Sequence, residues 1–305
     1  MDRKRQSRIF VLGSYAVGMT AECTTFPKTG QTVRGIDFQM LHGGKGSNQA
    51  IAAARLGADV TFCTCLGCDA LGDDAMKLFA HEKLHSNYVK RLESSTTGVG
   101  VVLLDKDGNN EIVICLGANN FFTATDVTGI EGAIAASDIL LVQLEFNIEA
   151  IIRAIEIAHK NNVKVILNPA PFQVIPDSVI RQVDIITPNE TEAQEMAGTS
   201  CYTSEIPKML FEKYNCSVVV TLGSKGSYIK TKEFDELIPP YPLNPIDTTG
   251  AGDTFSGALA VAIGEGKNIK DATWFATKAA AFSVTKKGVV ESLPAREEID
   301  NLTGC

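Results

Sequence analysis

Apolar residues from position 139 onward fall into two alternating patterns. Short aliphatic and β-branched runs predict buried strands at Ile139–Val142, Val163–Leu167, Ile185–Thr187 and Ser217–Leu222. The segments between them carry apolar residues at helical spacing, which predicts helices at about Ile148–His159, at Glu190–Ala197 and at about Glu205–Tyr214. Strands that alternate with helices are typical of parallel strands joined by crossover helices. We therefore expect an α/β protein with a doubly wound, mostly parallel central sheet flanked by helices.

The N-terminal half adds strands of two kinds. Arg8–Leu12 and Val60–Cys65 are apolar runs that extend the same sheet. Three other runs, the last two joined by a polar turn, predict a small antiparallel β lid: Thr32–Met40, Val99–Leu104 and Glu111–Cys115. No linker separates these parts. We expect one α/β domain over residues 1–305, with lid strands at about 14–41 and 97–116 inserted in it.

Composition excludes several classes of protein. The chain has 305 residues, 45% of them hydrophobic, which is enough for a large buried core. Its net charge of -8 argues against nucleic acid as a partner, because nucleic-acid binding rests on cationic contacts to phosphates. No apolar run approaches the roughly 18 residues of a membrane span, and the N-terminus lacks the apolar core of a signal peptide. We expect a cytoplasmic protein that binds no membrane, with its eight cysteines reduced.

The segment Asp247–Gly257 predicts an anion site. Its small residues open an apolar helix, so the N–H groups of Gly250, Ala251 and Gly252 are expected to point outward at the helix N-terminus. Asp253 lies at the mouth of this site, where a carboxylate can accept a proton from a hydroxyl that attacks a phosphate. The simpler interpretation of Asp253 is a helix N-cap.

A second glycine cluster favours the phosphate interpretation. Residues Gly43–Asn48 also precede a helix, expected at Ala50–Leu56, and offer a lysine, an asparagine amide and backbone donors suited to a polyhydroxylated ligand. A capping motif would not need such a partner.

Six motifs follow one another along nearly the whole chain: Gly43-Gly44-Lys45-Gly46-Ser47-Asn48-Gln49-Ala50, Gln143-Leu144-Glu145, Asn168-Pro169-Ala170-Pro171, Thr187-Pro188-Asn189-Glu190-Thr191-Glu192, Thr221-Leu222-Gly223-Ser224-Lys225-Gly226, and Asp247 to Gly257. In this order they resemble the ribokinase and deoxyribokinase branch of the ribokinase (phosphofructokinase-B) family of carbohydrate kinases. The resemblance implies ATP-dependent phosphorylation of a primary hydroxyl of a small, ribose-like sugar. It also implies that the lid covers the sugar and carries a homodimer contact.

The resemblance assigns roles to matching residues. Asp253 matches the catalytic base, and Gly250, Ala251 and Gly252 match the groups that stabilise the transferring phosphoryl. The positions that match sugar contacts are Gly43, Gly44, Lys45, Asn48 and Glu145. The positions assigned to ATP are Asn189, Thr221, Gly223, Ser224 and Gly226. Glu192 matches a carboxylate that reaches Mg²⁺ through water. The positions that ring a monovalent cation, K⁺, are Asp247, Thr249, Ser283, Lys286, Gly288 and Ser292.

Some of these residues also have a simpler, purely structural interpretation. Without the motif, Lys45 is a solvated surface lysine and Glu145 an acid at a strand end. Asn189 and Glu192 also fit a capped first helical turn, and both roles can hold at once.

The chain departs from the family pattern after its first strand. Ribokinases carry Asn and Asp there, two residues apart, and both hold ribose hydroxyls; the matching positions here are Ala16 and Gly18. The sequence therefore does not name the sugar. Alternatives are a nucleoside or other small-alcohol kinase of the same superfamily, or a catalytically silent sugar-binding regulator, which would need no base at Asp253.

Overall fold

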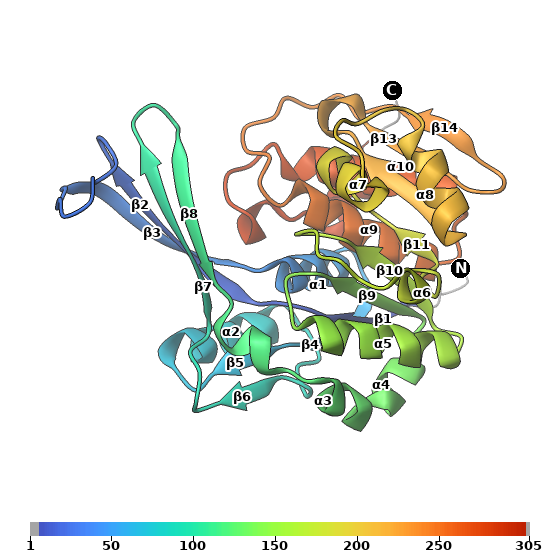
Figure 1. Cartoon of the computed structure of the whole chain (residues 1–305), viewed down its shortest axis with the longest axis horizontal. Coiled ribbons are helices and arrows are strands. Elements are labelled where there is room, and N and C mark those ends of the chain that lie inside the picture. Colours follow the sequence, from blue (N-terminus) through green and yellow to red (C-terminus); the bar gives the residue numbers. More distant parts are fainter. Residues whose placement is uncertain (1–5, 303–305) are drawn as a thin grey trace.

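Eight strands form the central sheet of the computed structural model, which describes residues 6–302 (Figure 1). Six are parallel: β4 (Asp59–Cys63), β1 (Arg8–Leu12), β9 (Ile139–Gln143), β10 (Lys164–Asn168), β11 (Ile185–Ile186) and β12 (Ser217–Thr221). Antiparallel strands β13 (Ser227–Lys230) and β14 (Asp235–Ile238) complete the edge next to β12.

Side-chain alternation along the strands fills two separate cores. Ile9 and Val11 of β1 pack in the core that contains α1 (Lys45–Arg55), α9 (Ala251–Gly264) and α10 (Ile269–Ser283). Phe10 and Leu12 of the same strand pack in the other core, with α5 (Ile148–Lys160) and α8 (Ile206–Tyr214). Successive side chains of a strand point to opposite faces, so both faces of the sheet are covered. The doubly wound α/β prediction is confirmed.

The remaining helical segments are α2 (Ala70–His81), α3 (Ala124–Gly129), α4 (Glu131–Ala135), α6 (Asp177–Ile180), α7 (Glu190–Ala197), α11 (Arg296–Asp300) and the 3₁₀ turns η1 (Gly117–Phe121), η2 (Gly223–Lys225) and η3 (Val290–Ser292). Within residues 6–302, no helix has the length and apolar character needed to cross a membrane.

Two details of the sheet differ from the sequence predictions. The strand expected at Val60–Cys65 ends at Cys63, and β5 (Cys65–Gly67) pairs instead with β6 (Lys90–Leu92) in a separate two-stranded sheet. The hairpin β13–β14 was not predicted. Buried positions alternate with intermediate ones in β13, and only Ile238 is buried in β14, so both strands lack the continuous apolar run that marks a parallel strand.

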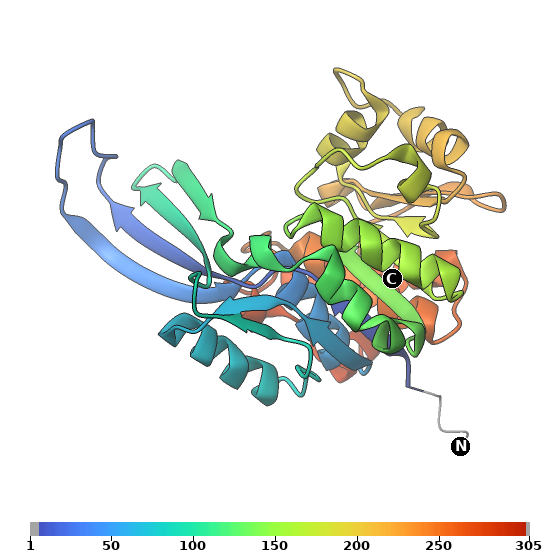
Figure 2. The ribbon, with the colours of Figure 1, turned by 60° about the horizontal axis from the view of Figure 1, so that its bottom comes forward.

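The lid is a four-stranded sheet of β3 (Gly35–Gly43), β2 (Ala16–Cys23), β7 (Gly98–Asp105) and β8 (Asn110–Cys115), in that spatial order. Its outer pairs are antiparallel, as expected, whereas the central pair β2–β7 is parallel. Figures 1 and 2 show this sheet projecting from the body as an arm.

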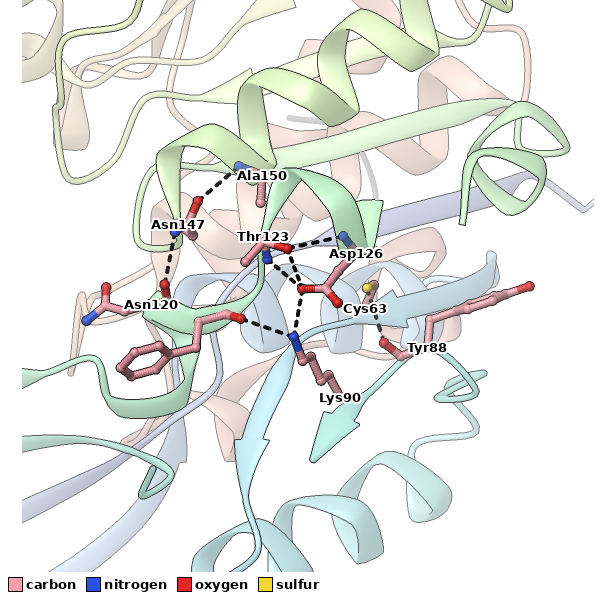
Figure 3. Close-up of polar contacts among 9 residues, drawn as sticks. Cys63, Tyr88, Lys90, Asn120, Thr123, Asp126, Asn147 and Ala150 are labelled. Atoms are coloured by element: carbon pink, nitrogen blue, oxygen red, sulfur yellow. Dashed lines mark hydrogen bonds and ion pairs between the residues drawn. The ribbon is translucent and has the colours of Figure 1, made fainter. Parts of the chain in front are cut away.

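The chain that leaves the lid after β8 is attached to the body (Figure 3). Asn147, the N-cap of α5, donates from Nδ2 to the Asn120 carbonyl at 2.9 Å. Lys90 Nζ donates to the Phe121 carbonyl at 3.3 Å and to Asp126 Oδ2 at 2.7 Å. These bonds fix η1, and with it the exit of the lid, against β6 and α5.

Candidate active site

The sequence-predicted site residues gather at the carboxyl edge of the parallel sheet, where open α/β sheets bind ligands. Ser14 follows β1, Glu145 follows β9 and Asn189 follows β11, while α1 and α9 begin at the same edge. Two surface hollows of about 430 and 380 Å³ lie at the opposite edge and contain none of the candidate residues.

Asp253 lies in the first turn of α9 and is 7% exposed. Its carboxylate accepts hydrogen bonds from two amides of α1: Oδ2 from Asn48 Nδ2 at 2.9 Å and Oδ1 from Gln49 Nε2 at 3.0 Å. The N-cap of α9 is Gly250, and no side chain caps this helix. The N-cap interpretation of Asp253 is therefore wrong.

The start of α9 presents backbone donors beside this carboxylate. Gly250 has φ of 78°, in the left-handed region that favours glycine. Among the described residues, no acceptor is recorded for the N–H groups of Gly250 and Gly252, whereas Ala251 N–H donates to the Thr248 carbonyl at 3.3 Å. A helix N-terminus with open N–H groups attracts an anion. An anion bound there would lie next to Asp253.

Lys45 and Glu145 meet at the start of α1. Glu145 Oε2 accepts the Lys45 N–H at 2.9 Å and the Ser14 hydroxyl at 2.7 Å. Burial alone would lower the pKa of the Lys45 ammonium, but the carboxylates of Asp253, Glu145 and Glu192 outweigh it and raise that pKa. Lys45 is thus a partly buried cation among three acids and not a solvated surface lysine.

Two buried amide oxygens in this region lack a hydrogen-bond partner among the described residues, Asn48 Oδ1 and Gln143 Oε1. Asn48 is 5% exposed, and its Oδ1 has no hydrogen-bond partner among the described residues, although its Nδ2 is bonded to Asp253. A buried amide oxygen without a partner costs free energy unless a ligand satisfies it.

Gly43 and Gly44 join the lid to α1. Gly43 ends β3 opposite Ala16 of β2, and Gly44, with φ of 94°, is the N-cap of α1. A Cβ on Gly44 would lie 2.7 Å from the backbone of Tyr15 and Ala16. Only glycine permits this close approach, so the motif sets the position of the lid over the edge of the sheet.

Asn189 and Glu192 form a reciprocal capping box at the start of α7, with bonds of 2.8 and 2.9 Å, so the predicted helix cap is present. Burial raises the pKa of Glu192, and the Asp253 carboxylate adds to that rise, against the opposing effects of the Asn189 N–H and the Lys45 charge. Glu192 thus lies within electrostatic reach of both Lys45 and Asp253.

The predicted nucleotide loop follows β12. Thr221 ends the strand and bridges to Asn189, with its N–H donating to the Pro188 carbonyl at 2.9 Å. The 3₁₀ turn η2 follows, and it contains Gly223 and Ser224 and ends at Gly226. Asn189 and the glycine-rich turn are therefore neighbours, as a shared ligand would require.

The residues predicted to surround a cation lie in two segments of the chain, 247–249 and 283–292. Asp247 accepts the N–H of Thr249 at 3.0 Å and the N–H of Gly288 at 3.1 Å. Burial works to raise the pKa of Asp247, but the bonds from Thr249 and Gly288 outweigh it and lower that pKa. The side chains of Ser283 and Ser292 donate to carbonyls of their own segments, and Lys286 Nζ pairs with Glu298 at 3.1 Å. The Lys286 ammonium cannot bind a cation, so Lys286 has only its backbone carbonyl to offer to one.

Comparison with known proteins adds four likenesses. Residues 6–296 match the model of the pfkB family carbohydrate kinase. A ribokinase of Haemophilus influenzae is 40% identical over 94% of this chain and 95% of its own, and a deoxyribokinase of Salmonella typhi is 31% identical over 96% and 97%. The structure of Arabidopsis thaliana ribokinase complexed with ribose and ATP has a TM-score of 0.87, with 32% identity over 98% of this chain and 99% of its own. The chain therefore belongs to the pfkB family of carbohydrate kinases.

Proposed function

We propose that this protein transfers the γ-phosphoryl group of ATP to a primary hydroxyl of a ribose-like sugar. Its relatives named ribokinase and the structural neighbour with ribose and ATP support this substrate pair. The observation that carries the proposal is the buried Asp253 carboxylate, held by two amides beside the open N-terminus of α9. Since ATP is a cytoplasmic metabolite, we expect the reaction to occur in the cytoplasm.

In this proposal, Asp253 accepts the proton of the attacking hydroxyl. The N–H groups of Gly250, Ala251 and Gly252 stabilise the charge on the transferring phosphoryl, with Gly250 and Gly252 as the open donors. Lys45, which lies near the carboxylates of Asp253, Glu145 and Glu192, binds a sugar hydroxyl on the same side. The lid excludes water, which would otherwise compete with the sugar for the phosphoryl group.

The sugar lies between the lid and α1 in this proposal. Asn48 Oδ1, which is buried and unpartnered, accepts a sugar hydroxyl. Glu145 accepts another, and the backbone of Gly43 and Gly44 lines the same space.

On the nucleotide side, Asn189 faces the phosphates, and Thr221, Gly223, Ser224 and Gly226 line the base and ribose of ATP. Among residues 6–302, no group of three or more His, Cys, Asp or Glu side chains is placed to hold a metal ion. We propose that Mg²⁺ is bound to the ATP phosphates and is reached by Glu192 through water, because Mg²⁺ gives up its water reluctantly. The buried carboxylate of Glu192, close to Lys45 and Asp253, fits that role. The ion would neutralise phosphate charge during transfer.

We expect K⁺ to raise kcat several-fold over Na⁺ at fixed ionic strength. Asp247 ties the chain at Thr249 to that at Gly288, next to the phosphoryl site, so an ion bound there would shape the Gly250 backbone. Initial rates in KCl and NaCl measure the effect, and Asp247→Asn should abolish the difference. Equal wild-type rates in the two salts would refute a K⁺ site.

A second copy of this chain is the partner that we propose for the lid. Phe38, Met40, Val101 and Val113 are all exposed, and the strand registers place Met40, Val101 and Val113 in one row across the sheet. Phe38 shares their face, because it lies two residues from Met40. Ala16 and Gly18 lie on the opposite face, the one assigned to the sugar. An apolar face of this kind is typical of an interface.

Phe38→Glu should therefore shift the protein toward monomer in analytical ultracentrifugation, because it places a charge within the proposed contact. Met209→Glu is the control, since Met209 is 43% exposed on α8, away from the lid. A wild-type protein that sediments as a monomer at all accessible concentrations would contradict a dimer through the lid.

Activity with a panel of pentoses, deoxypentoses, hexoses and nucleosides tests the proposed function. ADP release that depends on a pentose supports it. Preference for a nucleoside would support the alternative of a nucleoside kinase, and no activity with any acceptor would support a silent binding protein.

A further inference from the structure

A buried cluster of three amides lies beneath Asp253. Gln49 of α1 and Gln143, the last residue of β9, are fully buried, and Asn168, the last residue of β10, is 6% exposed. Gln49 Nε2 donates to Asp253 Oδ1 and to Asn168 Oδ1, at 3.0 Å each, and Gln143 Nε2 donates to Gln49 Oε1 at 2.6 Å. Burying amides is costly where their bonds are not made, and Gln143 Oε1 has no hydrogen-bond partner among the described residues, so the cluster needs an explanation.

The direction of these bonds is set by a backbone group. Asn168 Nδ2 donates to the Thr187 carbonyl at 2.9 Å. A carbonyl only accepts, so Asn168 must turn its Nδ2 toward Thr187 and its Oδ1 toward Gln49. Gln49 must then turn its Nε2 toward Asn168 and Asp253, which leaves its Oε1 for Gln143. Each amide therefore has one orientation, and the chain of bonds ends with an N–H directed at the carboxylate.

The packing of α1 on α9 keeps Gln49 within reach. A Cβ added to Gly257, one turn after Asp253, would lie 2.7 Å from the Gln49 carbonyl and 2.9 Å from Ala52 Cβ. The two helices thus touch at a glycine. Asn48, the residue before Gln49 in α1, donates to the other carboxylate oxygen, Oδ2. Both oxygens of Asp253 are therefore held by neighbouring residues of α1.

We propose that Gln49 is a positioning residue for phosphoryl transfer, and that Gln143 and Asn168 hold it in the one orientation that delivers an N–H to Asp253 Oδ1. The inference rests on the proposed function, since it takes Asp253 as the base. With Oδ1 held by Gln49, the carboxylate plane is fixed and Oδ2 faces the side of Asn48. A small rotation of the carboxylate would lower the rate, because proton transfer depends on the position of the accepting oxygen.

The test is a double-mutant cycle between Gln49→Met and Asp253→Asn. Methionine nearly matches glutamine in length but has no N–H to donate. We expect Gln49→Met to lower kcat about tenfold or more, with the KM values for sugar and ATP within about threefold of wild type. In the Asp253→Asn background the same substitution should lower kcat by less than about twofold, because its effect passes through the carboxylate.

Two further variants keep the test decisive. Gln143→Met leaves the bond from Gln49 to Asp253 in place but removes the donor that orients Gln49, so a smaller loss of kcat, about threefold, is expected even if Gln49→Met folds poorly. Asn161→Leu is the matched control. It removes a partly buried amide at the end of α5, at the opposite edge of the sheet, and should leave kcat unchanged.

The outcomes separate the two proposals. Full activity of Asp253→Asn would overturn the proposed base. An inactive Asp253→Asn together with fully active, folded Gln49→Met and Gln143→Met would overturn the positioning role alone. Equal losses from Gln49→Met in both backgrounds would show that Gln49 acts independently of Asp253, which also overturns it.

Discussion

Asp253→Asn is expected to lower kcat at least about a hundredfold while leaving the fold and the KM for ATP close to those of wild type. Asparagine has the same shape but cannot accept the proton of the sugar hydroxyl, and a general base contributes about 10² to 10⁴ in rate. The measurement is steady-state kinetics with a coupled ADP assay, together with circular dichroism to confirm the fold.

Asp271→Asn is the matched control for that variant. Asp271 also lies in the first turn of a helix, α10, where its N–H is bonded to the N-cap Asn268. It should keep wild-type turnover. If Asp253→Asn turned over within a few-fold of wild type, Asp253 would not be the base.

Ala16→Asn combined with Gly18→Asp is expected to lower the KM for ribose about tenfold or more. A hydrogen bond to a charged group contributes about 1.5 to 3 kcal/mol, and the wild type has no side-chain donor or acceptor at either position. Gly18 lies in β2 with ordinary extended backbone, and a Cβ there would be 3.7 Å from the nearest atom, the Leu41 carbonyl oxygen. Aspartate therefore fits at position 18 without backbone strain.

Gly100→Asp provides a control for position. Gly100 pairs with Gly18 on the neighbouring strand β7 and has no atom within 4 Å of an added Cβ, so the same carboxylate is introduced one strand away. It should not lower the KM for ribose. A folded double variant with unchanged ribose kinetics would show that positions 16 and 18 do not set specificity.

The central sheet was predictable because its parallel strands are buried on both faces. Ile139 to Val142, for example, are all buried, and such strands appear in the sequence as unbroken apolar runs. The hairpin β13–β14 gave no such signal, since Asp235–Ile238 alternates exposed, intermediate and buried positions at the edge of the sheet. The sequence also does not show that the chain leaves the central sheet after Cys63. Cys65 and Leu66 are buried and apolar in β5, as they would be if they continued β4.

The candidate site was predictable where a local motif defines it. The glycines before α9 mark a helix start, and the structure has α9 beginning at Ala251. The helix expected at Ala50–Leu56 begins earlier, at Lys45, so the second half of the glycine motif forms its first turn. The contacts between motifs could not be predicted from the sequence, because they join residues far apart in the chain. Asn48 and Asp253 are 205 positions apart. The one sign of Gln49 in the sequence is its place in the glycine motif, directly before the apolar run Ala50–Ala54 of α1.

The most direct test of the account is the product formed from ATP and the preferred pentose. We predict one ADP for each sugar phosphate, and a phosphate monoester whose ³¹P NMR signal is split by two protons, because the phosphoryl group is attached to a primary carbon. ADP release without a sugar phosphate, or a signal split by a single proton, as from a secondary hydroxyl, would contradict the assignment of this site to phosphorylation of a primary sugar hydroxyl.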